Sequence, residues 1–183
     1  MINPGSQFPA FETTACVSIE PGAEFKRVSS KDVAGKWLVL YTYPKDFTFV
    51  CPTEILEFDR KVSAFEERGA VVMGASTDNE YSHLAWRKDH EPLNALRHPL
   101  LFLAPAMAQA LGVLHPSAGV ALRATLIVDP TGTVRFASAN DLDVGRNVDE
   151  VLRVLDGLQT GELVACNWRR GETTLTQQLK GKR

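Results

Sequence analysis

The 183-residue sequence offers little that would suit a membrane, a nucleic acid or a metal ion. Its longest apolar candidate, residues 100–114, is interrupted by Pro105 and Gly112 and is shorter than the roughly 20 residues of a membrane-spanning helix. A formal net charge of −2 gives no electrostatic reason to bind phosphate groups. No HExxH or CxxC spacing accompanies the histidines. We therefore expect no membrane, nucleic-acid or metal partner.

Cysteine is also scarce, which excludes a fold stapled by disulfides. The three cysteines, Cys16, Cys51 and Cys166, are too few and too scattered for such a framework. The N-terminal stretch "MINPGSQFPAF" has neither the basic flank nor the apolar core of a secretory signal. We therefore predict a cytoplasmic protein whose thiols have separate fates. Each thiol is a small buried hydrophobe unless its surroundings indicate otherwise.

The sequence does contain an alternation of strand-like and helix-like segments. Strands are predicted at residues 12–21, 36–44, 70–77 and 98–104, and as a hairpin at 123–139. Helices are predicted at residues 52–68, 79–91 and 148–160, with Asp78 and Asn147 as the N-caps of the second and third. This alternation predicts one α/β domain with a mixed central sheet and helices on both faces.

Clear periodicity is lost after Gly161, the predicted end of the last strong helix. We assign residues 1–161 to the compact domain and residues 162–183 to a C-terminal arm. The final stretch "QQLKGKR" is polar and basic, which predicts a mobile end.

Cys51 lies where the apolar stretch "FTFV" gives way to Pro52 and a helical pattern. The first turn of a helix has unpaired backbone N–H groups, and the helix dipole places partial positive charge there. Both effects favour the thiolate over the thiol. Taken alone this junction is weak evidence, because buried cysteines at helix starts are common.

The residues around Cys51 match a known active-site pattern. In "PKDFTFVCPTE" a proline, a threonine and a cysteine have the spacing found in peroxiredoxins, realised here as Pro44, Thr48 and Cys51. The arginine motif of the same family is found in "RATLIVDPTG", which begins at Arg123. The likeness covers residues 8–171. The chain thus resembles the typical two-cysteine peroxiredoxins, and within them the alkyl hydroperoxide reductase C type.

The resemblance implies a thioredoxin-like fold and a thiol-dependent peroxidase that reduces hydrogen peroxide and small organic hydroperoxides. Cys51 would attack the peroxide and become a sulfenic acid, while Arg123 stabilises the thiolate and the leaving oxygen. Thr48 would hold the peroxide through its hydroxyl, and Pro44 would shield the thiolate from water. No metal or cofactor is required. A redox-responsive chaperone or peroxide sensor of the same fold is the alternative.

Further residues resemble supporting positions of the family. Glu54 occupies the place of the second cysteine of thioredoxin, which excludes a thioredoxin-type dithiol. Glu54 and Arg146 resemble an ion pair that orients the catalytic arginine, and Trp86 resembles a packing residue near the site. His83 and His90 lie seven residues apart on one predicted helix, which indicates a half-exposed stripe without a catalytic role.

The second cysteine departs from the common pattern. In most typical relatives the resolving cysteine falls at the position of Val164, and the nearest thiol here is Cys166 in "GELVACNW". Either Cys166 forms the disulfide with Cys51 of a neighbouring subunit, which we prefer, or this is a one-cysteine enzyme. Cys16 resembles no catalytic position of the family, and we expect a structural role for it.

Assembly and regeneration are expected from the resemblance alone. Typical members pair edge to edge and form rings, so we expect a homodimer at least, and a decamer or dodecamer. A thioredoxin, a flavoprotein reductase or a small CxxC adaptor would reduce the disulfide. Easily over-oxidised relatives carry a Gly-Gly-Leu-Gly insertion and a C-terminal Tyr-Phe helix. The sequence has neither, which predicts resistance to over-oxidation.

Overall fold

The computed structural model describes residues 1–181 and divides the chain into two compact units. The first is Met1–Arg146, and the second begins at Asn147. The division into a domain of residues 1–161 and an arm of residues 162–183 stays a prediction. Within residues 1–181, no helix is long and apolar enough to cross a membrane.

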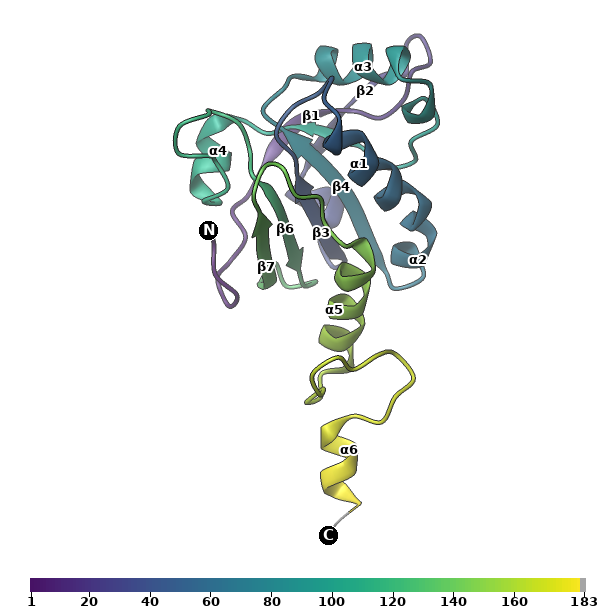
Figure 1. Ribbon diagram of the computed structural model, residues 1–183, viewed down its shortest axis with the longest axis vertical. Helices are drawn as coiled ribbons and strands as arrows, with labels where there is room; N and C mark the ends of the chain where they lie inside the picture. The colour runs from purple at the N-terminus through teal and green to yellow at the C-terminus, as the bar shows by residue number, and fades with distance from the viewer. Residues whose placement is uncertain (182–183) are drawn as a thin grey trace. The chain divides into compact units, whose positions relative to one another are not determined.

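A seven-stranded mixed sheet forms the centre of the first unit, in the order β2-β1-β5-β4-β3-β6-β7 (Figure 1). Its strands are β1 (Glu12–Cys16), β2 (Phe25–Ser29), β3 (Trp37–Thr42), β4 (Ala70–Ser76), β5 (Leu100–Phe102), β6 (Arg123–Val128) and β7 (Val134–Asn140). β3, β4 and β5 are parallel to one another, and all other neighbours are antiparallel. The predicted mixed sheet and the β6–β7 hairpin are confirmed.

Alternation along β3 gives the sheet two buried faces. Leu38 and Leu40 belong to an apolar cluster that also contains Ala108 of α4 (Pro105–Ala110). Tyr41 points to the other face and stacks on Phe58 of α1 (Val50–Arg60), with ring centroids 4.1 Å apart. Helices therefore cover both faces, as predicted.

Two predicted helices of the first unit differ in detail from the prediction, and α4 was not predicted. The helix expected at residues 52–68 forms as two pieces, α1 and α2 (Val62–Glu66). α3 (Glu80–Asp89) is present, but the predicted N-cap Asp78 is wrong, because Asn79 accepts hydrogen bonds from the first-turn N–H groups. The Asp78 carboxylate instead accepts from the N–H of Asp46 at 3.0 Å. The short 3₁₀ helices are η1 (Ser30–Val33) and η2 (Glu91–Leu93).

The second unit contains α5 (Val148–Thr160) and α6 (Leu175–Lys180). α5 is capped by Asn147 and ends at Gly161, whose φ of 63° lies in the left-handed region, so the last predicted helix is confirmed. α6 is a helix that the prediction missed, because residues after 161 lack clear periodicity. Thr174 and Gln177 form a capping box that starts this helix, a signal already present in the sequence as T-x-x-Q. The last two residues of "QQLKGKR" lie outside the described residues.

Candidate active site

Cys51 is the second residue of α1, at the predicted junction of loop and helix. The residue is fully buried. The N-cap residue of α1 is Phe49, whose side chain cannot accept a hydrogen bond, so the N–H groups of the first turn are left without a capping partner. This helix start therefore provides the partial positive charge that favours a thiolate.

Arg123, the first residue of β6, brings a guanidinium to this sulfur. Its Nη1 lies 3.4 Å from Cys51 Sγ and 2.8 Å from Glu54 Oε2, and its Nε donates to the carbonyl oxygen of Leu142 at 2.6 Å. Burial acts to lower the pKa of Arg123, but the contacts with Cys51 and Glu54 outweigh burial and raise it above its ordinary value. A charged group with fixed direction thus lies beside the thiol.

The sheet explains how Arg123 reaches a residue so distant in the sequence. β6 is the antiparallel neighbour of β3, and the loop that leads to Cys51 follows the end of β3. At this end, the hydroxyl of Thr42 donates to the carbonyl oxygen of Leu122 at 2.7 Å and accepts from the N–H of Ala124 at 3.2 Å. Thr42 therefore holds the backbone on both sides of Arg123.

Glu54 links Arg123 to a second arginine. It lies one helical turn after Cys51, which places both side chains on one face of α1. Arg146 donates to its carboxylate through Nε, Nη2 and the backbone N–H, each at 2.9 Å. Burial acts to raise the pKa of Glu54, but Arg146 and Arg123 outweigh burial and hold it below its usual range. The expected Glu54–Arg146 ion pair is therefore present and orients the arginine beside the thiol.

The loop that follows β7 returns Arg146 to the site. The side-chain amide of Asn140 donates to the carbonyl oxygens of Val144 and Gly145, at 3.1 and 3.0 Å. Arg146 then donates through Nη1 to the carbonyl oxygen of Ala124 at 2.6 Å. The loop is thus tied both to itself and to β6.

The loop between β3 and α1 carries Pro44 and Thr48. Pro44 is buried and has no N–H to offer. Thr48 is partly buried, and its hydroxyl donates to the carbonyl oxygen of Lys45 at 2.8 Å. A hydroxyl can rotate and still has lone pairs to accept a hydrogen bond, so this group remains suited to hold a peroxide.

The prediction missed the anchor of this loop, the buried carboxylate of Asp46. It accepts hydrogen bonds from the hydroxyls of Tyr43 and Ser82, both at 2.9 Å, and contacts His83 Nδ1 at 2.8 Å. His83 Nε2 faces the carbonyl oxygen of Leu101 at 3.1 Å. The predicted half-exposed position is therefore wrong for His83, which is fully buried. The sequence gives no spacing that would connect Asp46 with His83, because α1, α2 and β4 separate the two residues along the chain.

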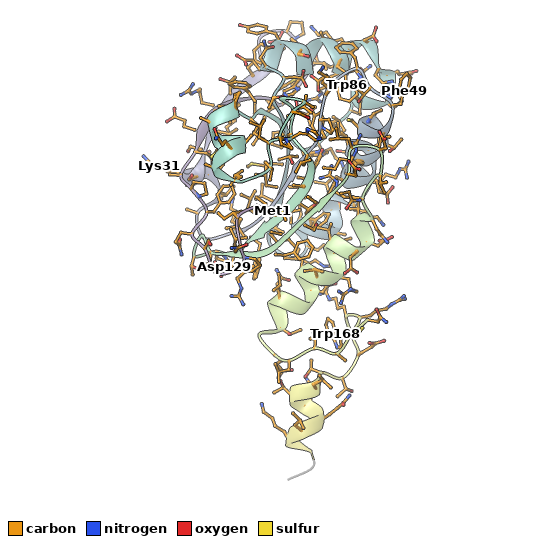
Figure 2. The ribbon with its side chains drawn as sticks, turned by 60° about the vertical axis from the view of Figure 1, so that its left-hand side comes forward. Met1, Lys31, Phe49, Trp86, Asp129 and Trp168 are labelled. Atoms are coloured by element: carbon orange, nitrogen blue, oxygen red, sulfur yellow. The ribbon has the colours of Figure 1, made fainter. Side chains whose placement is uncertain are left out.

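Trp86 packs on the same loop. Its ring centroid lies 6.1 Å from that of Phe47 and 6.2 Å from that of Tyr43. Phe47 has a φ of 55°, an uncommon value for a bulky residue, and Phe49 is 93% exposed. Figure 2 labels Phe49 and Trp86 in the first unit. The loop is thus supported by Trp86 and presents Phe49 to solvent.

Cys166 lies in the second unit, on an exposed turn of the arm. The N–H of Trp168 donates to the carbonyl oxygen of Ala165 at 3.1 Å, and Asn167 takes a left-handed conformation with φ 58°. Trp168, which is labelled in Figure 2, is buried. Its indole N–H donates to the carbonyl oxygen of Glu172 at 3.0 Å. The thiol is therefore presented to solvent on an anchored turn.

Known proteins resemble the chain along most of its length. Residues 4–137 match the model of the AhpC/TSA family. The chain belongs to the AhpC/TSA family. It is 49% identical over 180 residues to Alkyl hydroperoxide reductase C of Mycolicibacterium smegmatis, a match that covers 93% of this chain and 92% of that relative.

Solved structures of this family share the fold. Mycobacterium bovis AhpC superimposes with a TM-score of 0.82 at 46% identity, covering 92% of this chain and 99% of that one. The reduced 2-Cys peroxiredoxin of Plasmodium vivax gives a TM-score of 0.86 at 35% identity, covering 93% and 91%.

The predicted peroxiredoxin family, the thioredoxin-like fold and the enzyme class, a thiol-dependent peroxidase, are thereby confirmed. The alternative of a chaperone or peroxide sensor is not favoured. The roles assigned to Cys51, Thr48, Pro44, Arg123 and Cys166 stay predictions.

Proposed function

We propose that this peroxiredoxin reduces hydrogen peroxide and small organic hydroperoxides at Cys51, and that Cys166 of a second subunit resolves the oxidised sulfur. The distance of 3.4 Å between Arg123 Nη1 and Cys51 Sγ carries the proposal. A cation at this distance both stabilises a thiolate and offers donors to an oxygen that gains charge during the reaction.

In the first step, the Cys51 thiolate attacks the terminal oxygen of the hydroperoxide. An S–O bond forms, the O–O bond breaks, and two electrons pass from the sulfur to the leaving oxygen. The N–H groups of Arg123 stabilise that oxygen, which takes up a proton and leaves as water or an alcohol. The hydroxyl of Thr48, which donates to the carbonyl oxygen of Lys45, accepts a hydrogen bond from the bound peroxide, and it can donate to the peroxide by rotating away from Lys45. Pro44 adds no competing donor. The product is a sulfenic acid on Cys51.

In the second step, the Cys166 thiolate attacks the sulfenic sulfur, an S–S bond forms, and the sulfenic oxygen leaves as water. The exposure of Cys166 supports this role, because the thiol can approach a neighbouring subunit. A protein dithiol then returns two electrons and two protons to the pair. A thioredoxin, a flavoprotein reductase or a small CxxC adaptor meets this requirement.

We also propose a homodimer paired through β7, assembled further into a decamer or dodecamer. The two edge strands of the sheet are β7 and β2. β7 carries one charged residue, Arg135, whereas β2 carries two, Lys26 and Arg27. Charges on an edge strand discourage pairing, so β7 is the better edge. The exposed Phe47 and Phe49 supply a second apolar surface. Light scattering that shows a monomer in both redox states would contradict this assembly.

A cytoplasmic location, and the division into a domain of residues 1–161 and an arm of residues 162–183, belong to the same proposal. The reductant reaches the disulfide through this arm, since the arm carries the exposed Cys166.

Peroxide consumption with dithiothreitol as reductant tests the function. Cys51→Ser should abolish turnover while the protein still folds, because oxygen replaces sulfur almost isosterically but is a far poorer nucleophile. Cys16→Ser is the matched control, since it makes the same change at another fully buried cysteine, and it should turn over like the wild type. An active Cys51→Ser variant would contradict the proposal.

A further inference from the structure

Tyr41 carries a buried hydroxyl that the peroxidase steps do not use. The residue is fully buried in β3, and its Oη lies 2.7 Å from Nε2 of the buried His98. His98 Nδ1 lies 3.3 Å from Asp59 Oδ1 on α1. A phenylalanine ring would fill the same space without a polar group that must be satisfied. The hydroxyl therefore needs an explanation beyond packing.

The neighbouring strand leaves room for the end of the Tyr41 ring, hydroxyl included. Gly74 of β4 lies directly opposite Tyr41 in the parallel ladder. A Cβ at Gly74 would lie 2.5 Å from Tyr41 Oη, 2.6 Å from Tyr41 Cζ and 2.9 Å from Leu100 Cδ2, so glycine leaves room for the end of the Tyr41 ring together with its hydroxyl. Glycine weakens a strand interior, because it adds no side chain to pack and loses more backbone freedom on folding. Gly74 therefore lets the Tyr41 ring lie flat against β4 with its hydroxyl directed to His98.

The hydrogen bond has a defined direction. Burial lowers the pKa of His98, although Asp59 acts to raise it, so the ring is neutral at pH 7. The carboxylate of Asp59 only accepts, which places the ring proton on Nδ1 and leaves Nε2 to accept from Tyr41. The other charges that face His98 are Arg87 from α3 and Arg97 from the loop before β5. Tyr41 thus donates to a neutral imidazole that Asp59 orients.

The Tyr41 ring in turn supports the thiol site. The Cζ of Arg146 lies 5.3 Å from the centroid of the Tyr41 ring and 5.9 Å from that of Phe58, which is within reach of a cation–π interaction. The Nε and Nη2 groups of Arg146 donate hydrogen bonds to the carboxylate of Glu54. The same carboxylate accepts a hydrogen bond from Nη1 of Arg123, the guanidinium beside Cys51. Arg146 is therefore fixed at its edge by a carboxylate and on its face by the Tyr41 ring.

We propose that Tyr41 and His98 are positioning residues for the peroxidase reaction, because their buried hydrogen bond fixes the ring on which Arg146 rests. Through Arg146 and Glu54, this bond keeps the Arg123 guanidinium aligned with the Cys51 sulfur. Loss of the bond leaves His98 Nε2 without a hydrogen-bond partner in a buried site, which is unfavourable. The imidazole of His98 must then shift to find another partner, and the aromatic ring at position 41 loses the contact that fixed it. The inference rests on Cys51 as the reacting thiol, as proposed above.

Single-turnover oxidation by hydrogen peroxide, measured by stopped flow between pH 5 and pH 9, tests the inference. We expect Tyr41→Phe to react about two- to tenfold more slowly at pH 7, the range expected for partial loss of a cation–π contact. Its rate profile should also shift to higher pH. His98→Gln, which keeps an acceptor near the Nε2 position, should retain most of the rate, whereas His98→Met, which removes the acceptor, should behave like Tyr41→Phe.

Leu38→Val is the matched control, since it removes a buried methylene from the opposite face of the same strand. It should lower the free energy of unfolding and leave the oxidation rate unchanged. Tyr41→Phe and His98→Met with wild-type rates and pH profiles, whatever their stability, would overturn the inference. A wild-type protein that fails to react with peroxide would instead overturn the proposed function.

Discussion

Cys16 and Cys51 are both fully buried, and each lies beside a buried arginine. Arg87 Nη1 is 3.8 Å from Cys16 Sγ, and Arg123 Nη1 is 3.4 Å from Cys51 Sγ. The backbones differ more than these distances do. Cys16 ends a strand that is paired on both sides, whereas Cys51 lies in the first turn of a helix that no side chain caps.

The two arginines also differ in their other partners. Arg87 donates to the carbonyl oxygens of Cys16, Leu93, Asn94 and Leu96. Arg123 donates to the carboxylate of Glu54 as well as to a carbonyl oxygen. Burial raises the pKa of the Cys16 thiol, and Arg87 only partly offsets burial. A nearby guanidinium therefore does not by itself lower the pKa of a buried thiol such as Cys16, and Cys51 differs in its position at a helix start and in an arginine held by a carboxylate.

The largest expected difference between the cysteines is in disulfide formation, which should require Cys166 and not Cys16. After one equivalent of peroxide, non-reducing electrophoresis should show a linked dimer for the wild type and for Cys16→Ser, but only monomer for Cys166→Ser. The physical reason is access, because Cys166 is exposed and Cys16 is not. A dimer that persists in Cys166→Ser and is lost in Cys16→Ser would reverse the two assignments.

Removing each guanidinium while keeping its apolar stem should affect different properties. Arg123→Met should slow single-turnover oxidation by about 100- to 1000-fold, as when an oxyanion donor is removed. Arg87→Met should leave that rate within a factor of two but destabilise the fold by about 2–4 kcal/mol, since it strands several buried carbonyl oxygens. Stopped flow and urea unfolding measure the two effects. Equal rate losses in both variants would break the comparison.

Glu54→Gln should test the carboxylate that distinguishes the two sites. The change leaves two buried guanidinium groups without a counter-charge, so we expect a loss of about 3–5 kcal/mol in the free energy of unfolding. Glu57→Gln, on the same helix, removes a more exposed partner of Arg60 and should cost less than about 1 kcal/mol. Urea unfolding of both variants gives the values. Similar losses would show that Glu54 has no special structural role.

Lowering the pH should gradually remove the contribution of Glu54 to the free energy of unfolding. The folded pKa of Glu54 is held below its usual range, so its contribution is present at neutral pH and is lost as the pH falls through that folded value. The decline should begin near pH 4, where the unfolded carboxyl takes up its proton. Unfolding free energies measured from pH 6 to pH 3 should fall more steeply for the wild type than for Glu54→Gln. Parallel curves would contradict this origin.

Over-oxidation should be the smallest effect. During turnover with moderate peroxide, intact-mass and peptide mass spectrometry should find little sulfinic acid on Cys51 and none on Cys16, because resolution competes with the second oxidation and Cys16 is inaccessible. Stoichiometric conversion of Cys51 to the sulfinic acid would show that resolution is slow.

The local features of this protein were predictable from the sequence. The apolar run of β3, the cysteine before Pro52, the turn between β6 and β7 and the Asn147 cap each depend on residues a few positions apart. The proline, threonine, cysteine and arginine motifs added the family, and with it the expected site. The N-cap Asn79 and the helix α6 were missed, although Asn79 and the T-x-x-Q box are both visible locally.

Only the tertiary structure revealed the long-range pairs. Three buried pairs join elements that lie far apart in the sequence, with β4 between the two members of each pair along the chain: His83 with Asp46, Arg87 with Cys16, and Tyr41 with His98. The order of the strands in the sheet brings these elements together. Each pair involves a polar group that must find a partner once burial removes water. The sequence by itself determined which residues carry the chemistry. Their alignment was decided by tertiary packing, because strand order and burial are not encoded in any local spacing.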